Sequence, residues 1–155
     1  MKLVVACDPS GGIGYKNKLP WKRLQGDLPR FKALTSNQIV VMGRNTWESL
    51  PTKPLPNRTN VIVTSKIIDD LSNDIILALG LDFIPDDAWI IGGAKLINSS
   101  WDRVDEIHLS LTKTQYNCDT FIDLEQLHSK YTLTHTEECV DHIYQIWKKK
   151  NETVS

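Results

Sequence analysis

A carboxylate and an aromatic ring recur at helical spacing near the start of the chain. Asp27 and Phe31 stand four positions apart in the segment DLPRFK, and an α-helix places residues i and i+4 on one face. A carboxylate beside a ring suits the mouth of an apolar pocket, where it can hold a planar ligand with hydrogen-bond donors. The alternative is structural. Gly26 or Asp27 then caps a surface helix with Pro29 in its first turn, and the ring belongs to the core.

Four short apolar runs are each followed by glycine or polar residues. The runs span residues 2–7, 38–42, 59–63 and 88–91 and are typical of buried strands. The residues after them suit phosphate, because glycines allow close approach and a helix start offers free N–H groups. Open α/β sheets bind ligands beyond the carboxyl ends of their strands, so we expect a nucleotide site with several phosphates. The following residues are Gly11, Gly12 and Gly14; Arg44, Asn45 and Thr46; Thr64, Ser65 and Lys66; and Gly92 with Gly93.

The remaining segments predict the other elements that must position these residues. Residues 105–112 alternate between apolar and polar side chains, which is typical of a strand. Residues 132–138 and 142–149 predict an antiparallel pair at the sheet edge. Helices are expected over about 27–36 and 94–100, with one opening at Arg44, and a turn at Asp86 and Asp87. A short helix and a further strand are expected within residues 67–78.

Length and composition exclude several classes of protein. The chain has 155 residues, 41% apolar and 24% charged, so we expect a single domain over 1–155 with its own core. A net charge of −1 argues against nucleic-acid binding. No apolar run approaches the roughly 20 residues of a membrane span, and 2–7 is too short for a signal-peptide core, so a cytoplasmic chain is expected. Three cysteines without close pairing predict free thiols, and four histidines without ligand spacing predict no metal site.

Five motifs in order resemble the dihydrofolate reductase family. LPW at 19–21 is followed by DLxxFK at 27–32, and VMGRNTWESL occupies 41–50. LPNRTN at 55–60, VTS at 63–65 and IIGGA at 90–94 keep the family's order and approximate spacing. The resemblance covers the chain from Val4 to about Trp147. It implies an α/β fold with a doubly wound, mostly parallel eight-stranded sheet flanked by about four helices.

The same resemblance implies reduction of 7,8-dihydrofolate to 5,6,7,8-tetrahydrofolate by NADPH, which supplies one-carbon metabolism and thymidylate and purine synthesis. Hydride goes to C6 as water protonates N5, and Asp27 matches the family's sole active-site carboxylate, which binds the pterin and stabilises its positive charge. Trp21 would lie beside the substrate, and Ser110 stands where a threonine usually backs the carboxylate. Arg58 matches the cation that binds the glutamate α-carboxylate. The implied substrate-binding residues are Val4, Asp27, Leu28, Phe31, Lys32, Lys53, Arg58 and Ser110, although surface lysines are usually just solvated.

For the cofactor, the resemblance assigns the nicotinamide side to the loop around 12–19 and the phosphates to residues 44–46. Residues 64–66 match the 2′-phosphate site, which favours NADPH over NADH. The Gly92–Gly93 junction carries a non-proline cis peptide in the family. Ile97 departs from the Tyr or Phe usual over the nicotinamide, and Arg44 could instead be a surface side chain. The implied cofactor-binding residues are Ala6, Gly12, Ile13, Gly14, Asn17, Lys18, Leu19, Arg44, Asn45, Thr46, Thr64, Ser65, Lys66, Ile91, Gly92, Gly93, Ala94, Lys95, Leu96 and Ile97.

Two other functions stay open at this point. A reductase of the same fold that acts on a pyrimidine intermediate of riboflavin synthesis would share the NADPH half, but Asp27 and Arg58 argue against it. A non-catalytic module that binds a nucleotide or folate is the second, and Ile97 leaves room for it. We expect a monomer that binds dihydrofolate and antifolates such as methotrexate, without nucleic acid, membrane or metal.

Overall fold

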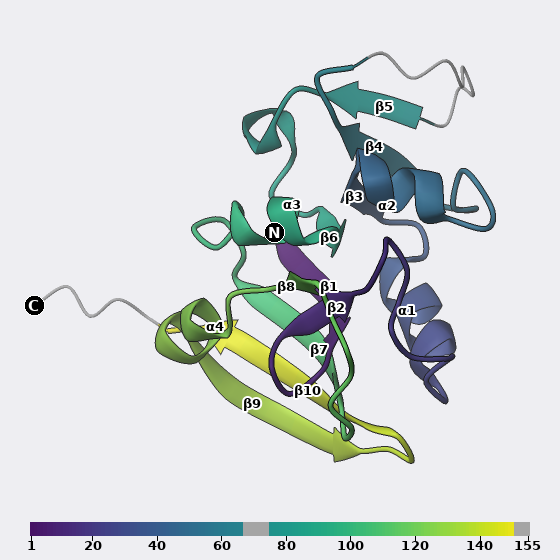
Figure 1. Ribbon diagram of the computed structural model, residues 1–155. Coiled ribbons are helices and arrows are strands. Elements are labelled where there is room, and N and C mark those ends of the chain that lie inside the picture. Colours follow the sequence, from purple (N-terminus) through teal and green to yellow (C-terminus); the bar gives the residue numbers. More distant parts are fainter. Residues whose placement is uncertain (67–74, 151–155) are drawn as a thin grey trace, which may run out of the picture.

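The computed structural model describes residues 1–66 and 75–150, and one eight-stranded sheet crosses it (Figure 1). Its strands are β1 (Lys2–Cys7), β3 (Ile39–Gly43), β4 (Thr59–Val63), β5 (Ile75–Ala78), β6 (Trp89–Gly92), β7 (Glu106–Thr112), β9 (Tyr131–Glu138) and β10 (His142–Lys149). The order across the sheet is β5-β4-β3-β6-β1-β7-β10-β9. The pairs from β5 to β7 are parallel, and β10 is antiparallel to β7 and β9. The predicted mostly parallel sheet with an antiparallel edge is confirmed.

Helices cover both faces of this sheet. They are α1 (Asp27–Thr35), α2 (Arg44–Ser49), α3 (Ala94–Asn98) and α4 (Leu124–Lys130). Leu34 of α1 and Trp47 of α2 pack with Val40 in one apolar cluster, the α1–α2 cluster. Leu96 of α3 and Leu127 of α4 belong to a second cluster, the α3–α4 cluster, with the neighbouring Val41 and with β1, β6 and β7. Successive strand residues point to opposite faces, so two helices lie on each side, which is the doubly wound arrangement predicted.

The four strands expected to end in phosphate-binding chemistry are neighbours in the sheet. β4, β3, β6 and β1 lie side by side and parallel, so their carboxyl ends meet at one edge. The register pairs Gly43 with Val63 and Met42 with Gly92. Arg44, Thr64 and Gly93 therefore follow these strands at the same edge.

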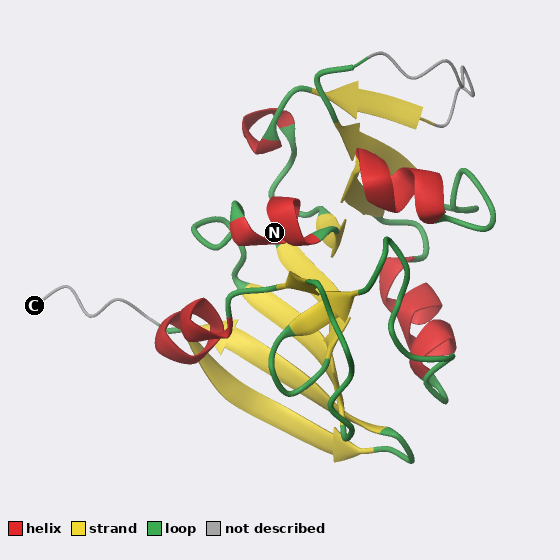
Figure 2. Ribbon diagram, in the orientation of Figure 1, coloured by secondary structure: helices red, strands yellow, loops and turns green. Residues whose placement is uncertain are grey.

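Several elements were not predicted. A small ribbon pairs β2 (Gly12–Gly14) with β8 (Thr120–Phe121), a 3-10 turn covers Leu81–Phe83, and α4 follows β8. A long loop joins β2 to α1 (Figure 2). Helix α3 ends at Asn98 rather than near residue 100, and β5 is the strand expected within 67–78. The short helix expected there falls on residues 67–74, outside the described residues. Within the described ranges, no helix is long and apolar enough to cross a membrane.

Candidate active site

The carboxylate of Asp27 is held against the middle of the sheet. Gly26 is the N-terminal cap of α1 and has a left-handed backbone (φ 85°). The predicted alternative in which Gly26 caps the helix is therefore confirmed. Asp27 does not serve as the cap: Ser110 Oγ on β7 donates to Asp27 Oδ1 at 2.5 Å. Arg30 Nη1 lies 3.8 Å from the same oxygen, and the Asp27 side chain remains 33% exposed. The predicted hydrogen bond from Ser110 is present, and the carboxylate keeps a face open to a ligand.

The apolar residues expected around this carboxylate differ in exposure. Val4 on β1 is half-buried beside the α1–α2 cluster, and Phe31 is half-buried with the Arg58 guanidinium 5.8 Å from its ring centroid. Leu28 is 54% exposed. Trp21 is buried and packs edge-on against Tyr116 at 5.5 Å. In this conformation Leu28 and Phe31 present apolar surface on the helix that carries Asp27, while Trp21 supports the loop that precedes α1.

The cation expected to bind the glutamate tail precedes β4 and is oriented by the end of α1 and by its own loop. Arg58 donates from Nη1 to Thr35 Oγ1 at 3.1 Å and from Nε to the Pro56 carbonyl at 2.9 Å. Burial lowers the pKa of the Arg58 guanidinium, which nevertheless stays charged at neutral pH. Lys32 and Lys53 are exposed and form no ion pair within the described residues.

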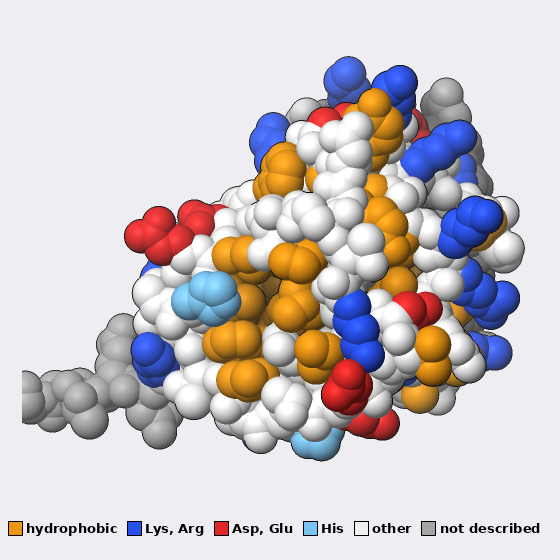
Figure 3. Space-filling view, turned by 60° about the horizontal axis from the view of Figure 1, so that its bottom comes forward, with side chains coloured by type: hydrophobic (Ala, Val, Ile, Leu, Met, Phe, Trp, Pro, Cys, Tyr) orange, Lys and Arg blue, Asp and Glu red, His pale blue; other side chains and the backbone are white. Residues whose placement is uncertain are grey.

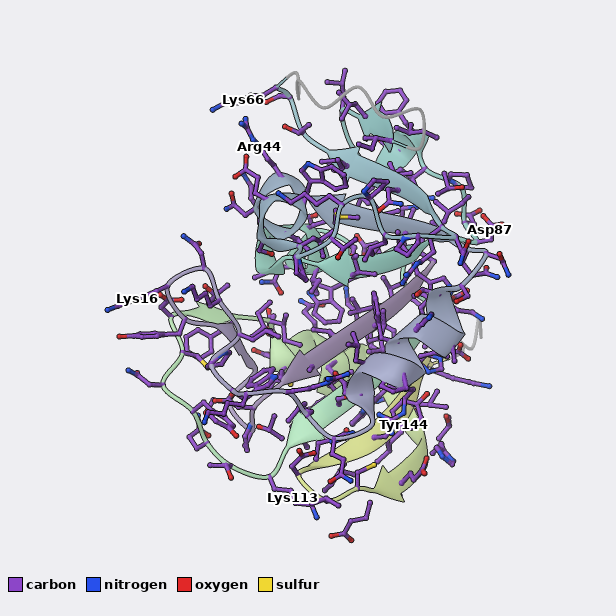
Figure 4. All side chains as sticks on the ribbon, turned by 90° about the vertical axis from the view of Figure 1, so that its right-hand side faces the viewer. Lys16, Arg44, Lys66, Asp87, Lys113 and Tyr144 are labelled. Carbon is purple, nitrogen blue, oxygen red and sulfur yellow. The ribbon has the colours of Figure 1, made fainter. Side chains whose placement is uncertain are left out.

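The sheet edge expected to bind phosphate carries cations, hydroxyls and glycines. Arg44 Nε pairs with Glu48 Oε1 at 2.8 Å, and Thr64 Oγ1 accepts from the Lys66 N–H at 3.1 Å. A Cβ at Gly93 would lie 3.3 Å from Thr46 Oγ1, so glycine keeps this passage open. The Gly92–Gly93 peptide is cis, as predicted. Arg44 and Lys66 lie on the same edge of the molecule, opposite Asp87 (Figure 4).

The rest of the expected cofactor residues surround this edge. Ala6 is half-buried on β1, and Ile13 packs against the core from β2. Asn17 has a positive φ of 63°, and Leu19 is 64% exposed. Ile97 has no exposed surface and packs in the α3–α4 cluster, so a ligand does not reach its side chain in this conformation. The remaining positions are Gly12 and Gly14 on β2, Lys18 in the loop, Asn45 and Thr46 on α2, Ser65 after β4, Ile91 and Gly92 on β6, and Ala94, Lys95 and Leu96 on α3.

A buried carboxylate missed by the sequence analysis fixes the loop beside the site. Asp8 has no exposed surface and accepts hydrogen bonds from Gly12 N at 2.8 Å and Ser10 N at 2.9 Å. It also accepts from Gln115 Nε2 at 2.9 Å and Tyr116 N at 3.1 Å. Asp8 therefore joins the end of β1 to the segment after β7. The signal in the sequence was an acidic residue directly after a buried strand and before a glycine-rich loop.

A second carboxylate fastens the same loop further out. Asp119 Oδ2 accepts from the Lys16 N–H at 2.9 Å, and the Asp119 N–H donates to the Gly14 carbonyl at 2.9 Å. The hydrogen bond from Lys16, followed by that from the Thr120 hydroxyl, lowers the pKa of Asp119. The carboxylate is therefore charged at neutral pH, and the loop is tied to β8 through it.

A separate apolar hollow lies on the other face of the sheet. Leu109 and Leu111 point away from the face that carries Ser110, so this hollow is not part of the Asp27 site. The view in Figure 3 shows apolar side chains gathered there. Its volume is about 250 Å³, and it is lined by Pro9, Leu109, Leu111, Leu124, Leu127, His128, Gln145 and Trp147.

The described residues contain no group of three or more His, Cys, Asp or Glu side chains arranged to hold a metal ion. The three cysteines are free, as predicted. His108 and His142 are buried and hydrogen-bonded, with His142 Nδ1 2.7 Å from Asp141 Oδ1. These two histidines therefore have a structural role, as hydrogen-bonded groups in the interior.

Fold and site together define a class. This is an α/β protein with one partly exposed carboxylate on α1, together with a strand edge that carries cations, hydroxyls and glycines suited to a phosphate-bearing ligand. A family model described as "Dihydrofolate reductase" matches residues 1–148. Dihydrofolate reductase type 8 from Escherichia coli is 33% identical over 97% of this chain and 96% of its own length.

Two further relatives also have dihydrofolate reductase in their names. Dihydrofolate reductase from Staphylococcus aureus is 36% identical over 78% of this chain and 76% of its own length. The bifunctional dihydrofolate reductase-thymidylate synthase of Paramecium tetraurelia is 32% identical over 96% of this chain and 34% of its own length. The chain belongs to the dihydrofolate reductase family, as its motifs had indicated.

Proposed function

We propose that this chain reduces 7,8-dihydrofolate to 5,6,7,8-tetrahydrofolate, with NADPH as the hydride donor. The observation that carries the proposal is the Asp27 carboxylate, which Ser110 holds at 2.5 Å beside the carboxyl edge of the parallel strands. Membership of the dihydrofolate reductase family supports the reaction. Antifolates such as methotrexate would bind to the same carboxylate.

Asp27 acts on the substrate by its charge and by its orientation. Hydride addition at C6 of the pterin goes with protonation of N5, so positive charge develops on the ring. A carboxylate fixed by a short hydrogen bond stabilises this charge without having to reorganise. A water molecule delivers the proton to N5, while Val4, Phe31 and Leu28 restrict the access of other water.

The phosphate-binding edge fits a dinucleotide with a 2′-phosphate. When bound, NADPH supplies the hydride. The ion pair between Arg44 and Glu48 is exposed and worth only about 0.3–0.5 kcal/mol, so Arg44 can exchange Glu48 for a phosphate oxygen. Lys66, Thr64 and Ser65 offer a cation and two hydroxyls to the 2′-phosphate. Because Gly92 and Gly93 have no side chains, they leave room for the dinucleotide beside Thr46.

The test is a spectrophotometric assay of NADPH oxidation with 7,8-dihydrofolate. We expect turnover that methotrexate abolishes and that falls when NADH replaces NADPH. Turnover with the pyrimidine intermediate of riboflavin synthesis instead of dihydrofolate would favour the related reductase. Methotrexate binding without any turnover would favour a non-catalytic module and contradict the proposal.

A further inference from the structure

The guanidinium of Arg30 lies where three segments meet. Arg30 is one helical turn after Asp27, and its Nη1 is 3.8 Å from Asp27 Oδ1. The same Nη1 lies 3.1 Å from His142 Nε2 at the start of β10. The guanidinium carbon is 4.1 Å from the ring centroid of Tyr144, and Nη2 is 3.5 Å from Cys139 Sγ. The Arg30 side chain is only 20% exposed, so the hairpin between β9 and β10 holds this charge in place.

These contacts fix the tautomer of His142. A guanidinium only donates hydrogen bonds, so His142 Nε2 must accept from Arg30. The ring proton therefore lies on Nδ1, which donates to Asp141 Oδ1 at 2.7 Å. The hydrogen bond from His142, followed by the one from the Gln25 N–H, lowers the pKa of Asp141. A neutral His142, with no exposed surface, thus orients Arg30.

The same pair of strands holds both members of the ion pair. Tyr144 on β10 is the direct register partner of Ser110 on β7. Ser110 donates to Asp27 Oδ1, while Arg30 stacks on the Tyr144 ring, so the four side chains form a closed group. Tyr144 can be found below α1 in Figure 4. A shift of β10 would move Arg30 and so alter the surroundings of the carboxylate.

We propose that Arg30 is a positioning residue for Asp27, held by His142 and Tyr144, and that its charge sets the upper pH limit of dihydrofolate reduction. The inference rests on the proposed function, in which Asp27 stabilises a cationic pterin. Within the described residues, Arg30 makes the one ion pair of Asp27, and Ser110 makes its one side-chain hydrogen bond. A second cation next to the carboxylate competes with the charge on the pterin, so the protonated pterin is lost at a lower pH.

Other charged groups lie behind Tyr144 rather than beside Asp27. The Tyr144 hydroxyl contacts His108 Nδ1 at 2.5 Å, and His108 Nε2 faces Glu106 at 3.0 Å. Burial raises the pKa of Tyr144, and the charge of Arg30 opposes that rise. Tyr144 therefore stays neutral near pH 7 and offers Arg30 the face of an uncharged ring.

The first test compares the pH profiles of turnover for Arg30→Gln, Arg30→Lys and wild type, with Arg23→Gln as the control for loss of an exposed cation. In Arg30→Gln, the midpoint of the alkaline limb should rise by about 0.5–1 pH unit, because both charges are partly exposed. Arg30→Lys keeps the cation and should recover at least half of that shift. Arg23→Gln should follow wild type. An unshifted Arg30→Gln profile, or a lysine variant shifted as far as the glutamine variant, would overturn the proposal.

The second test begins with the His142 tautomer, which can be read without turnover. ¹⁵N NMR of the ligand-free protein should show His142 as the neutral Nδ1–H tautomer at neutral pH. Asp141→Ala removes the acceptor, so the tautomer should change and the alkaline midpoint should move in the same direction as in Arg30→Gln. Absence of dihydrofolate turnover in wild type would refute the proposed function while leaving the tautomer readable. A charged or Nε2–H His142 in wild type would refute the positioning network by itself.

Discussion

The carboxylate side of the site, around Asp27, and the proposed phosphate side, around Arg44 and Lys66, are built in different ways. Asp27 is already engaged by Ser110 and Arg30, both of which are themselves held by the sheet. On the phosphate side, Arg44 pairs with an exposed Glu48, and the Lys66 side chain is exposed. Groups fixed in advance serve a charge that develops during the reaction, whereas exposed groups can be ordered by the ligand they bind. Changes on the carboxylate side should therefore act on turnover, and changes on the phosphate side on cofactor affinity.

The largest effect should come from Asp27→Asn. The amide keeps the shape but removes the charge that stabilises the pterin cation, so turnover near pH 7 should fall by about 100-fold or more. NADPH affinity, measured by fluorescence titration, should change much less. Normal turnover in this variant would show that the carboxylate has been assigned wrongly.

Ser110→Ala should show how much the hydrogen bond to Asp27 contributes. A hydrogen bond to a charged group is worth about 1.5–3 kcal/mol, so kcat/KM for dihydrofolate should drop roughly 10-fold or more. Ser110→Thr retains a hydroxyl and is the matched control, which should stay near wild type. If the alanine variant equals wild type, the contact at 2.5 Å does not matter for the reaction.

Lys66→Ala tests the phosphate side. Loss of a cation near the 2′-phosphate should weaken NADPH by about 10-fold and leave NADH, which lacks that phosphate, nearly unchanged. Lys113→Ala is a control, because Lys113 pairs with Glu138 and lies on the opposite side of the molecule from Lys66 (Figure 4). Equal weakening of NADPH and NADH by Lys66→Ala would argue against a 2′-phosphate contact.

The smallest expected effect concerns the thiols of Cys7 and Cys118, next to the Asp8 carboxylate that fixes the loop beside the site. Burial, with a further contribution from the Asp8 charge, raises the pKa of Cys7 to about 12 and that of Cys118 to about 11. A raised thiol pKa means that the reactive thiolate is scarce at lower pH, so both cysteines should react slowly with iodoacetamide near pH 8. Asp8→Asn removes the charge and should speed labelling of Cys118, read by mass spectrometry. Rapid labelling of Cys118 in wild type would contradict this.

The parts that were predicted rest on local patterns. The strands at 2–7 and 59–63 are short apolar runs bounded by polar residues, and Asp27 was found through its spacing to Phe31 and its surrounding motif. Helix α4 also carried a local signal that was missed. Asp123 precedes Leu124 and accepts from the Gln126 N–H, an acidic cap at the usual distance. This cap is a local pattern that indicates the start of a helix at Leu124.

The parts that were missed depend on contacts between distant segments. Asp8 meets Gln115, which is 107 residues away, and Arg30 meets His142, which is 112 residues away. Nothing in the sequence around Arg30 distinguishes it from a surface arginine, because its partners are chosen by the register of β10 on β7. Ile97 shows the converse: its position in the motif gave a role over the nicotinamide, while its burial follows from the packing of α3.

A crystal structure of the chain with NADPH and folate tests the central claim most directly. We predict that the pterin ring lies within hydrogen-bond distance of the Asp27 carboxylate, with Ser110 and Arg30 still in contact with Oδ1. The phosphates should lie over residues 44–46 and the Gly92–Gly93 junction. A pterin bound elsewhere, or an Asp27 side chain turned toward solvent in that complex, would contradict the account.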